Sequence, residues 1–221
     1  MRFRQGRATR GSQKWVQLLV NENPRLLTDA VRAAAKLSKD WMVRWVSPLM
    51  SDDWAEYRDM DFLAAMGLGR LADDLEKFWP EGGPQWDALG RSNDGGAVLV
   101  EAKSHTGELA SSCGATEDSL RMIERSLDAT RVALGAEPTA DWLNGFYQYA
   151  NRLAHLYFFQ HSRVPARLVF LYFVNDAEMG GPTSAGQWKT FLESAYRHLG
   201  LRAALLPHGV VDVFIDVSTL P

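Results

Sequence analysis

The chain has 221 residues, of which 46% are hydrophobic and 23% charged. This composition supplies one hydrophobic core and excludes a disordered or collagenous chain. No apolar run reaches the ~18 residues of a membrane-spanning helix, and the formal net charge of -3 excludes binding of nucleic acid through a strongly basic surface overall. We therefore expect one compact soluble domain with no membrane partner.

The start of the chain and its cysteine content indicate the compartment. The first fourteen residues carry basic side chains and no acid, and no apolar stretch of a signal peptide follows them. This segment is interpreted as a solvated arm, with contact to a polyanion as the alternative. The single cysteine, Cys113, excludes an internal disulfide. Together these features predict a cytoplasmic protein. The basic residues of the arm are Arg2, Arg4, Arg7, Arg10 and Lys14.

Apolar residues at helical spacing dominate the first third of the chain. The predicted elements are, in chain order, two helices within Ser12–Ser38 that are separated at Asn23-Pro24, a short segment Trp41–Leu49, and helices over about Asp53–Met66 and Leu71–Phe78. We expect residues 1–50 to form a helical extension that packs on a core of residues 51–221, within one compact domain.

Strand signals begin in the middle of the chain. Two apolar segments flank the turn-rich Arg91–Gly96 and predict a β-hairpin, after which helices alternate with apolar strands. The expected elements are hairpin strands Gln85–Leu89 and Ala97–Lys103, helices Thr116–Leu134 and Asp141–Gln160, strand Ala166–Val174, helix Ser184–Leu199 and strand Val210–Val217. This order predicts an α/β fold, with a mixed β-sheet flanked by helices.

Two acids of the hairpin are candidates for a common site. In a loop centred on Asp94, Asp87 lies opposite Glu101, whereas a two-residue turn places Asp87 opposite Ala102. Period-two alternation places Glu101 and Lys103 on the same face of their strand. Converging carboxylates suit a hard divalent cation such as Mg²⁺. A surface pair of glutamate and lysine at a strand end is the alternative.

Asp87, followed by Glu101-Ala102-Lys103 at the end of an apolar strand, resembles the PD-(D/E)XK, or restriction-endonuclease-like, nuclease superfamily. The resemblance covers about residues 51–176 and implies a restriction-endonuclease-like fold. It also implies that Asp87 and Glu101 bind Mg²⁺ or Mn²⁺ and that Lys103 positions the attacking water. Trp86 stands where the motif name has proline, and little room remains between Phe78 and Pro84 for the strand that usually precedes the Asp strand.

The resemblance suggests further site residues. Members of the superfamily often add a glutamate from the first core helix, which Glu56 or Glu76 could supply, and Glu56 is favoured. Some members place a glutamine on the helix after the E-x-K strand, so Gln148, with Arg152 four residues later, is a possible phosphate contact. For each of these residues the alternative is a solvated helix face.

The sequence thus predicts metal-dependent, nuclease-like phosphodiester hydrolysis, with nucleic acid, DNA rather than RNA, as the partner. Asp87, Glu101, Lys103 and Glu56 are the predicted catalytic residues. The alternatives are a non-catalytic protein of the same fold that binds nucleic acid or protein, and an enzyme that acts on a small phosphate ester. A nuclease needs a basic rim around its acids. Candidates for this rim are Arg91, Lys103, Arg121, Arg152 and the N-terminal arm.

Overall fold

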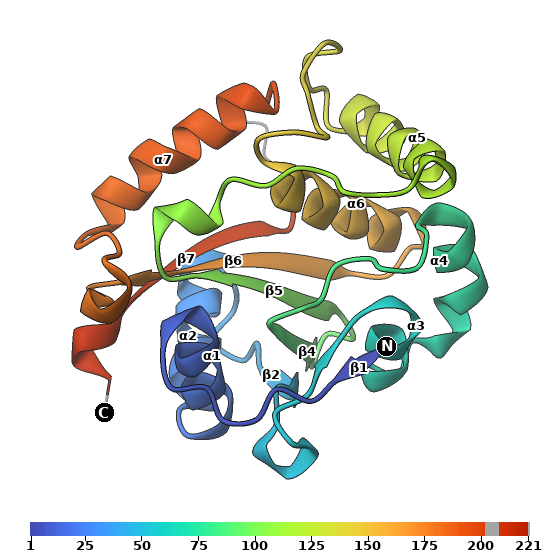
Figure 1. Cartoon of the computed structure of the whole chain (residues 1–221). Coiled ribbons are helices and arrows are strands. Elements are labelled where there is room, and N and C mark those ends of the chain that lie inside the picture. The colour runs from blue at the N-terminus through green and yellow to red at the C-terminus, as the bar shows by residue number, and fades with distance from the viewer. Residues whose placement is uncertain (202–207, 221) are drawn as a thin grey trace.

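A five-stranded mixed sheet forms the centre of the structure, which is a computed structural model describing residues 1–201 and 208–220 (Figure 1). The strand order is β2-β4-β5-β6-β7, in which β2, β4 and β5 run antiparallel and β5, β6 and β7 run parallel. The strands are β2 (Val43–Ser47), β4 (Ala88–Ser92), β5 (Ala97–Lys103), β6 (Ala166–Val174) and β7 (Val210–Asp216). The predicted mixed sheet flanked by helices is confirmed.

Helices cover both faces of this sheet, and each face has its own hydrophobic core. In Figure 1, α1 (Gly11–Asn21) and α2 (Pro24–Ala34) lie below the sheet. The larger core on the opposite face includes residues of α3 (Asp59–Ala65), α4 (Ala72–Phe78), α5 (Glu117–Ala133), α6 (Tyr147–His161) and α7 (Ala185–His198). Because both faces are covered, β6 is apolar at odd and even positions alike, as Phe170 packs into one core and Leu171 into the other.

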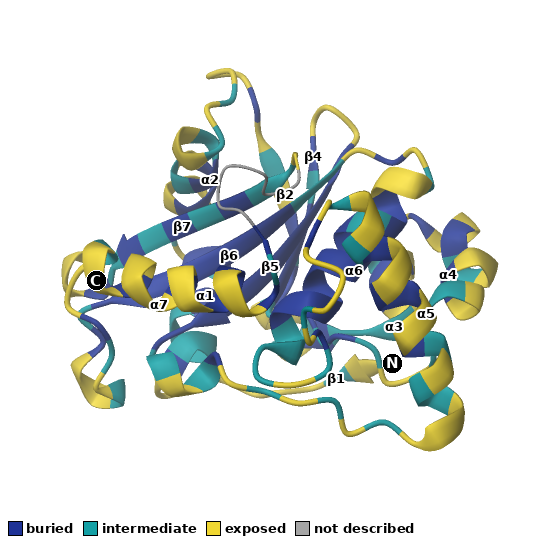
Figure 2. Cartoon of the chain, turned by 90° about the horizontal axis from the view of Figure 1, so that it is seen from above, coloured by how far each residue is buried: buried dark blue, intermediate teal, exposed yellow. Residues whose placement is uncertain are grey.

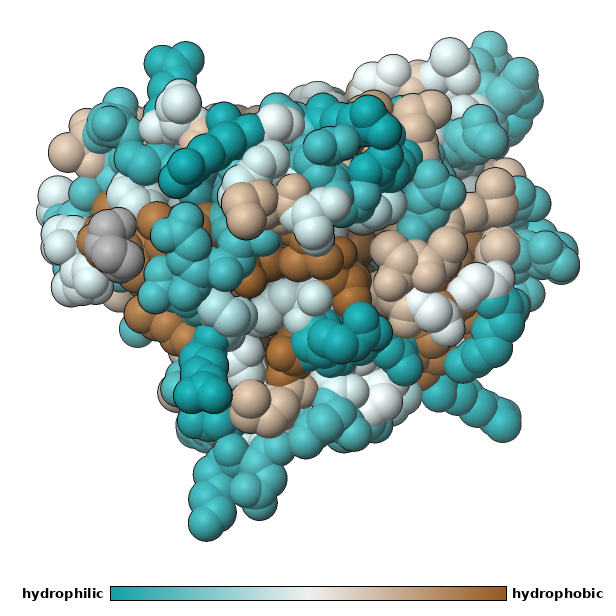
Figure 3. Space-filling model, turned by 90° about the horizontal axis from the view of Figure 1, so that it is seen from below, coloured by the Kyte–Doolittle hydropathy of each residue, from teal (hydrophilic) through white to brown (hydrophobic). Residues whose placement is uncertain are grey.

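Burial follows from this layered arrangement. Every residue of β5 is buried, and β6 is buried from its third residue onward, while Figure 2 shows the outer sides of the helices exposed. The face seen from the side of α1, α2 and β2 has hydrophilic residues around its rim and a hydrophobic band across its middle (Figure 3). None of the helices in residues 1–201 and 208–220 is long and apolar enough to span a membrane.

The N-terminal arm does not extend freely into solvent. Its side chains are largely exposed, but β1 (Arg2–Phe3) pairs antiparallel with β3 (Glu56–Tyr57) in a separate two-stranded sheet. The backbone pairing holds the arm beside Glu56 before the chain enters α1. The arm is therefore part of the folded structure next to one of the predicted site residues.

The strand β2 lies within the predicted N-terminal extension of residues 1–50. It pairs antiparallel with β4 and forms one edge of the central sheet. The strand expected to precede the Asp87 strand is therefore supplied by β2, which lies beside β4, because the segment between Phe78 and Pro84 contains no strand. The chain places this strand before α3 and α4 rather than after them.

Two predicted helices begin later than expected. Asp53 and Trp54 have φ of 52° and 56°, which a right-handed helix does not accommodate, so the chain forms β3 before α3 begins at Asp59. The helix predicted from Asp141 begins at Tyr147, because the Asp141 carboxylate accepts hydrogen bonds from the next backbone amides and Gly145 has φ of 78°. The prediction was therefore wrong for the first turns of both helices.

Candidate functional site

The hairpin register brings the two predicted metal ligands to the same end of the sheet. Ala88 pairs with Val100 and Arg91 with Ala97, which is the register of a loop centred on Asp94. Continued by one residue, this pairing places Asp87 opposite Glu101. The backbone N–H of Asp87 donates to Val100 O at 3.2 Å, and its Oδ2 accepts a hydrogen bond from Ala102 N at 2.7 Å. The alternative register is thereby excluded.

A polar pocket of ≈ 420 Å³ opens at this end of the sheet. All the site residues predicted from the sequence line this pocket, although they come from β3, from the segment just before β4, from β5 and from α6. They are Glu56, Asp87, Glu101, Lys103, Gln148 and Arg152. Glu76, the less favoured glutamate, does not line this pocket but borders a different cavity. The fold therefore gathers the candidate residues around one space.

Glu101 is the centre of a buried ion-pair network. Its side chain is only 4% exposed, and its Oε1 lies 2.5 Å from Lys103 Nζ. Its Oε2 accepts from Nε of Arg152 at 2.7 Å and lies 2.5 Å from Nη2 of the same side chain. Burial alone would raise the pKa of Glu101, but the charges of Arg152 and Lys103 outweigh burial and lower it. Glu101 is accordingly an ionised carboxylate whose two oxygens are both engaged.

Asp87 is placed differently from Glu101. Among the described residues, no basic side chain forms an ion pair with Asp87, and the carboxyl group of Asp87 accepts a single hydrogen bond, from the Ala102 amide. Burial and the negative charges of Glu101 and Glu56 raise the pKa of Asp87 well above its usual range. Asp87 is therefore a carboxyl group that an additional positive charge in the pocket would stabilise in its ionised form.

Glu56 reaches the pocket from β3, not from a helix as expected. It is 4% exposed and accepts hydrogen bonds from three glutamines, Gln5 and Gln13 at 3.0 Å and Gln85 at 2.5 Å. Burial raises its pKa despite these three hydrogen bonds. Sequence reasoning did not identify these glutamines, because Gln5 and Gln13 belong to the arm and nothing in the local pattern links them to Glu56.

The polar residues of α6 face the protein interior. Asn151, Arg152 and His155 are 7%, 5% and 1% exposed, so the alternative of a solvated helix face is wrong for them. Lys103 Nζ donates to Gln148 Oε1 at 2.9 Å. Arg152 lies over the Trp86 ring at 4.9 Å and also donates to Gln85 O at 3.0 Å. Gln148 and Arg152 thus hold the two charged residues of β5 in place.

The loop after β5 supplies further pocket residues that the sequence did not indicate. Ser111 accepts a hydrogen bond at its Oγ from Gln148 N, 2.8 Å away, and so fixes the start of α6. Glu108 of this loop and Tyr147, the first residue of α6, line the same pocket, and burial raises the pKa of both side chains. The dense run of small polar residues near Ser111 and Ser112 was the only available signal, and such runs are common in loops.

The candidate basic residues do not form a rim around the pocket. Only Lys103 and Arg152 line it, and both are bound to Glu101. Arg91 lies near the turn end of the hairpin, away from Asp87. Arg121 forms its ion pairs on the exposed side of α5. Four basic side chains of the arm form ion pairs elsewhere: Arg2 with Asp52, Arg4 with Asp53, Arg7 with Glu22, and Lys14 with Glu178.

The donor chemistry of the pocket fits a hard divalent cation. Glu56, Asp87 and Glu101 contribute carboxylate oxygens, the ligands that Mg²⁺ and Mn²⁺ prefer. Within residues 1–201 and 208–220, however, no three acidic, histidine or cysteine side chains converge on one metal position. Asp87 and Glu101 would hold the ion only if Glu101 exchanged Lys103 or Arg152 for it.

The fold and the pocket together define a mixed α/β protein with a buried acidic and basic cluster at the end of its central hairpin. No protein-family model, no curated protein and no solved structure matches this chain. The function must therefore be argued from the residues of the pocket.

Proposed function

We propose that the protein is a metal-dependent phosphodiesterase of the nuclease type, with a restriction-endonuclease-like core. The observation that carries the proposal is the position of Asp87, which lies opposite Glu101, shares one polar pocket with Lys103, and has no basic partner of its own among the described residues. A carboxyl group with a raised pKa beside a second, ionised carboxylate is the electrostatic arrangement that a bound cation relieves.

The chain's own residues divide the work. Asp87 and Glu101 would hold Mg²⁺ or Mn²⁺, and Glu56 is a further acidic group in the same pocket. Lys103, positioned by Gln148 at 2.9 Å, orients the attacking water and balances negative charge that develops on the phosphoryl group. When bound, the cation supplies Lewis-acid activation of the phosphoryl group and of water. Arg152 and Lys103 keep Glu101 ionised, and one of them would have to release a carboxylate oxygen of Glu101 for that oxygen to serve as a metal ligand.

Nucleic acid, with DNA preferred over RNA, is the proposed substrate. The pocket is an open polar cavity, and the two basic residues that line it, Lys103 and Arg152, are of the types that bind phosphate oxygens. The net charge of -3 and the paired arm arginines favour local contacts at one phosphodiester over a long electrostatic footprint.

The test measures metal binding first and cleavage second. Calorimetric titration with Mn²⁺ of the wild type, Asp87→Asn and Glu101→Gln should give saturable binding that both variants lose. Glu124→Gln removes one negative charge from the exposed side of α5 and is the matched control, which should bind as the wild type does. Cleavage of single- and double-stranded DNA, RNA and bis(p-nitrophenyl) phosphate then separates the chemistry from nucleic-acid recognition. Metal-dependent cleavage that survives Glu101→Gln would refute the proposed mechanism.

A non-catalytic protein of the same fold is the second candidate function. The observation in its favour is that Lys103 and Arg152 already satisfy both oxygens of Glu101, so that the cluster is stable without a metal. In that case Mn²⁺ binds neither the wild type nor the variants, also in the presence of a DNA duplex. Affinity for nucleic acid, measured without cleavage, would then define a binding protein.

A further inference from the structure

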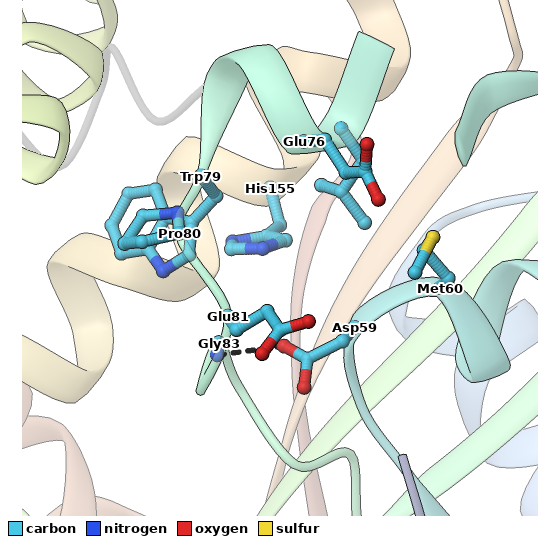
Figure 4. A pocket seen from close by; sticks show the side chains of 9 residues that line it. Asp59, Met60, Glu76, Trp79, Pro80, Glu81, Gly83 and His155 are labelled. Atoms are coloured by element: carbon cyan, nitrogen blue, oxygen red, sulfur yellow. Dashed lines mark hydrogen bonds between the residues drawn. The ribbon is translucent and has the colours of Figure 1, made fainter. Parts of the chain in front are cut away.

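A second cavity lies between α3, α4 and α6, on the other side of the loop at Gly83 from the pocket of Asp87 and Glu101 (Figure 4). Its volume is ≈ 190 Å³. A single ordered water needs only about 10–15 Å³ of such space. The cavity is therefore larger than a site for a single bridging water.

A buried histidine presents an unpaired acceptor to this cavity. His155 is 1% exposed, and its Nδ1 lies 2.8 Å from the carbonyl oxygen of Asn151. Because a carbonyl only accepts, Nδ1 carries the proton. Burial, together with the charge of Arg152, lowers the pKa of His155 to about 3, so the ring is neutral at physiological pH. Its Nε2 thus carries a lone pair, and no described residue donates a hydrogen bond to it.

The cavity is also acidic. Asp59, Glu76 and Glu81 line it, and no basic residue does. Asp59 is already engaged, since it accepts hydrogen bonds from the amides of Gly82 and Gly83 and lies 3.4 Å from Arg58 Nε. Glu76 and Glu81 form no ion pair with a described residue. Their two charges are available to a ligand.

An aromatic wall completes the cavity. Trp79 is 4% exposed, and its ring centroid lies 5.0 Å from that of His155. In Figure 4 the imidazole of His155 lies between Trp79 and Pro80 on one side and the carboxyl groups of Asp59 and Glu81 on the other. An indole ring attracts a cation through its quadrupole, so Trp79 and the carboxylates both favour a positively charged ligand.

We propose that this cavity binds a primary ammonium group, which donates an N–H to Nε2 of His155 while Glu76 and Glu81 balance its charge. The alkyl chain that carries the ammonium group packs along Trp79 and Pro80. A free alkylamine or a lysine side chain of a partner protein supplies the same chemistry. The inference does not depend on the phosphodiesterase activity, because none of the proposed metal ligands lines this cavity.

The test is titration with n-butylammonium, followed through the indole N–H resonance of Trp79. Saturable binding is expected for the wild type, and His155→Phe should weaken it at least about tenfold, since a hydrogen bond from a charged donor is lost. Glu81→Gln, an exposed substitution, should weaken it several-fold, whereas Glu124→Gln should leave it unchanged. Tetramethylammonium, which has the charge but no N–H, should not saturate the site.

Two further probes separate the sources of the ammonium group. N-acetyl-lysine methylamide binding more tightly than n-butylammonium would assign the cavity to a partner's lysine, and the reverse order would assign it to a free amine. The proposal is overturned if n-butylammonium does not saturate the wild type, if tetramethylammonium binds equally well, or if Glu81→Gln has no effect. The Glu81 variant keeps the test decisive should His155→Phe fail to fold.

Discussion

Replacing Arg152 with methionine should expose how strongly the pocket depends on its buried ion pairs. The guanidinium group holds Oε2 of Glu101 through Nε at 2.7 Å and Nη2 at 2.5 Å, and both side chains are nearly inaccessible. Removing one partner of a buried pair costs about 3–5 kcal/mol of folding free energy. Since Lys103 still neutralises Oε1 of Glu101, we expect the lower end, about 3 kcal/mol.

Urea denaturation at pH 7, followed by tryptophan fluorescence, measures this loss. Arg121→Met is the matched control, because its ion pairs with Glu117 and Asp118 are exposed and should contribute less than about 0.5 kcal/mol. The double variant Glu101→Gln, Arg152→Met should lose less than the sum of the single variants, since Arg152 and Glu101 no longer leave each other unpaired and only Lys103 lacks its partner. A loss below about 1 kcal/mol for Arg152→Met, or strict additivity, would refute the reasoning.

Three further changes test other parts of the structure. Burial raises the pKa of Asp212 from 3.8 to about 6, while Tyr196 donates to it at 2.9 Å. The stability that the protonated Asp212 contributes is fully present below pH 3.8 and is lost as the pH rises through 6. Asp212→Asn should therefore be more stable than the wild type above pH 7, by up to about 3 kcal/mol, and equally stable near pH 4. Denaturation of both proteins at the two pH values measures the difference. Gly181→Ala should destabilise the protein by about 1–3 kcal/mol in thermal denaturation, because the added Cβ would lie 2.0 Å from Ser104 O; unchanged stability would contradict that contact. Ser184→Ala removes the hydroxyl that caps α7 by accepting from Gln187 N at 3.3 Å, and should cost about 1 kcal/mol in the same assay.

Local patterns were sufficient to predict most of the helices and strands. The strand Ala166–Val174 was predicted with its observed bounds, because apolar residues at every position match a strand covered on both faces. The register was left open between two turns, and the structure has the loop centred on Asp94. Ser92 and Gly96, on either side of the turn, are buried. The carboxylate of Asp94 accepts a hydrogen bond from the Gly96 amide at 3.2 Å, and this bond stabilises the loop centred on Asp94.

Long-range contacts account for what the sequence did not predict. The strand β2 is stabilised by pairing with β4, some forty positions later in the chain, and by the burial of Trp45. Arg152 and Glu101 lie 51 positions apart, so no spacing rule links them. The glutamines around Glu56 likewise come from distant parts of the chain, since Gln5 follows β1, Gln13 lies in α1 and Gln85 precedes β4. Such partners become visible only when the chain is folded.

The hairpin of β4 and β5 also constrains the order in which the protein folds. Its strands are joined by the short turn Asn93–Gly96, whereas every other strand pair among the described residues closes a long loop. Local pairings form before distant ones, because closing a long loop costs more chain entropy. The hairpin therefore closes while the carboxylates of Asp87 and Glu101 are still hydrated. The later docking of α6, which brings Arg152, is the step at which Glu101 exchanges water for a guanidinium group.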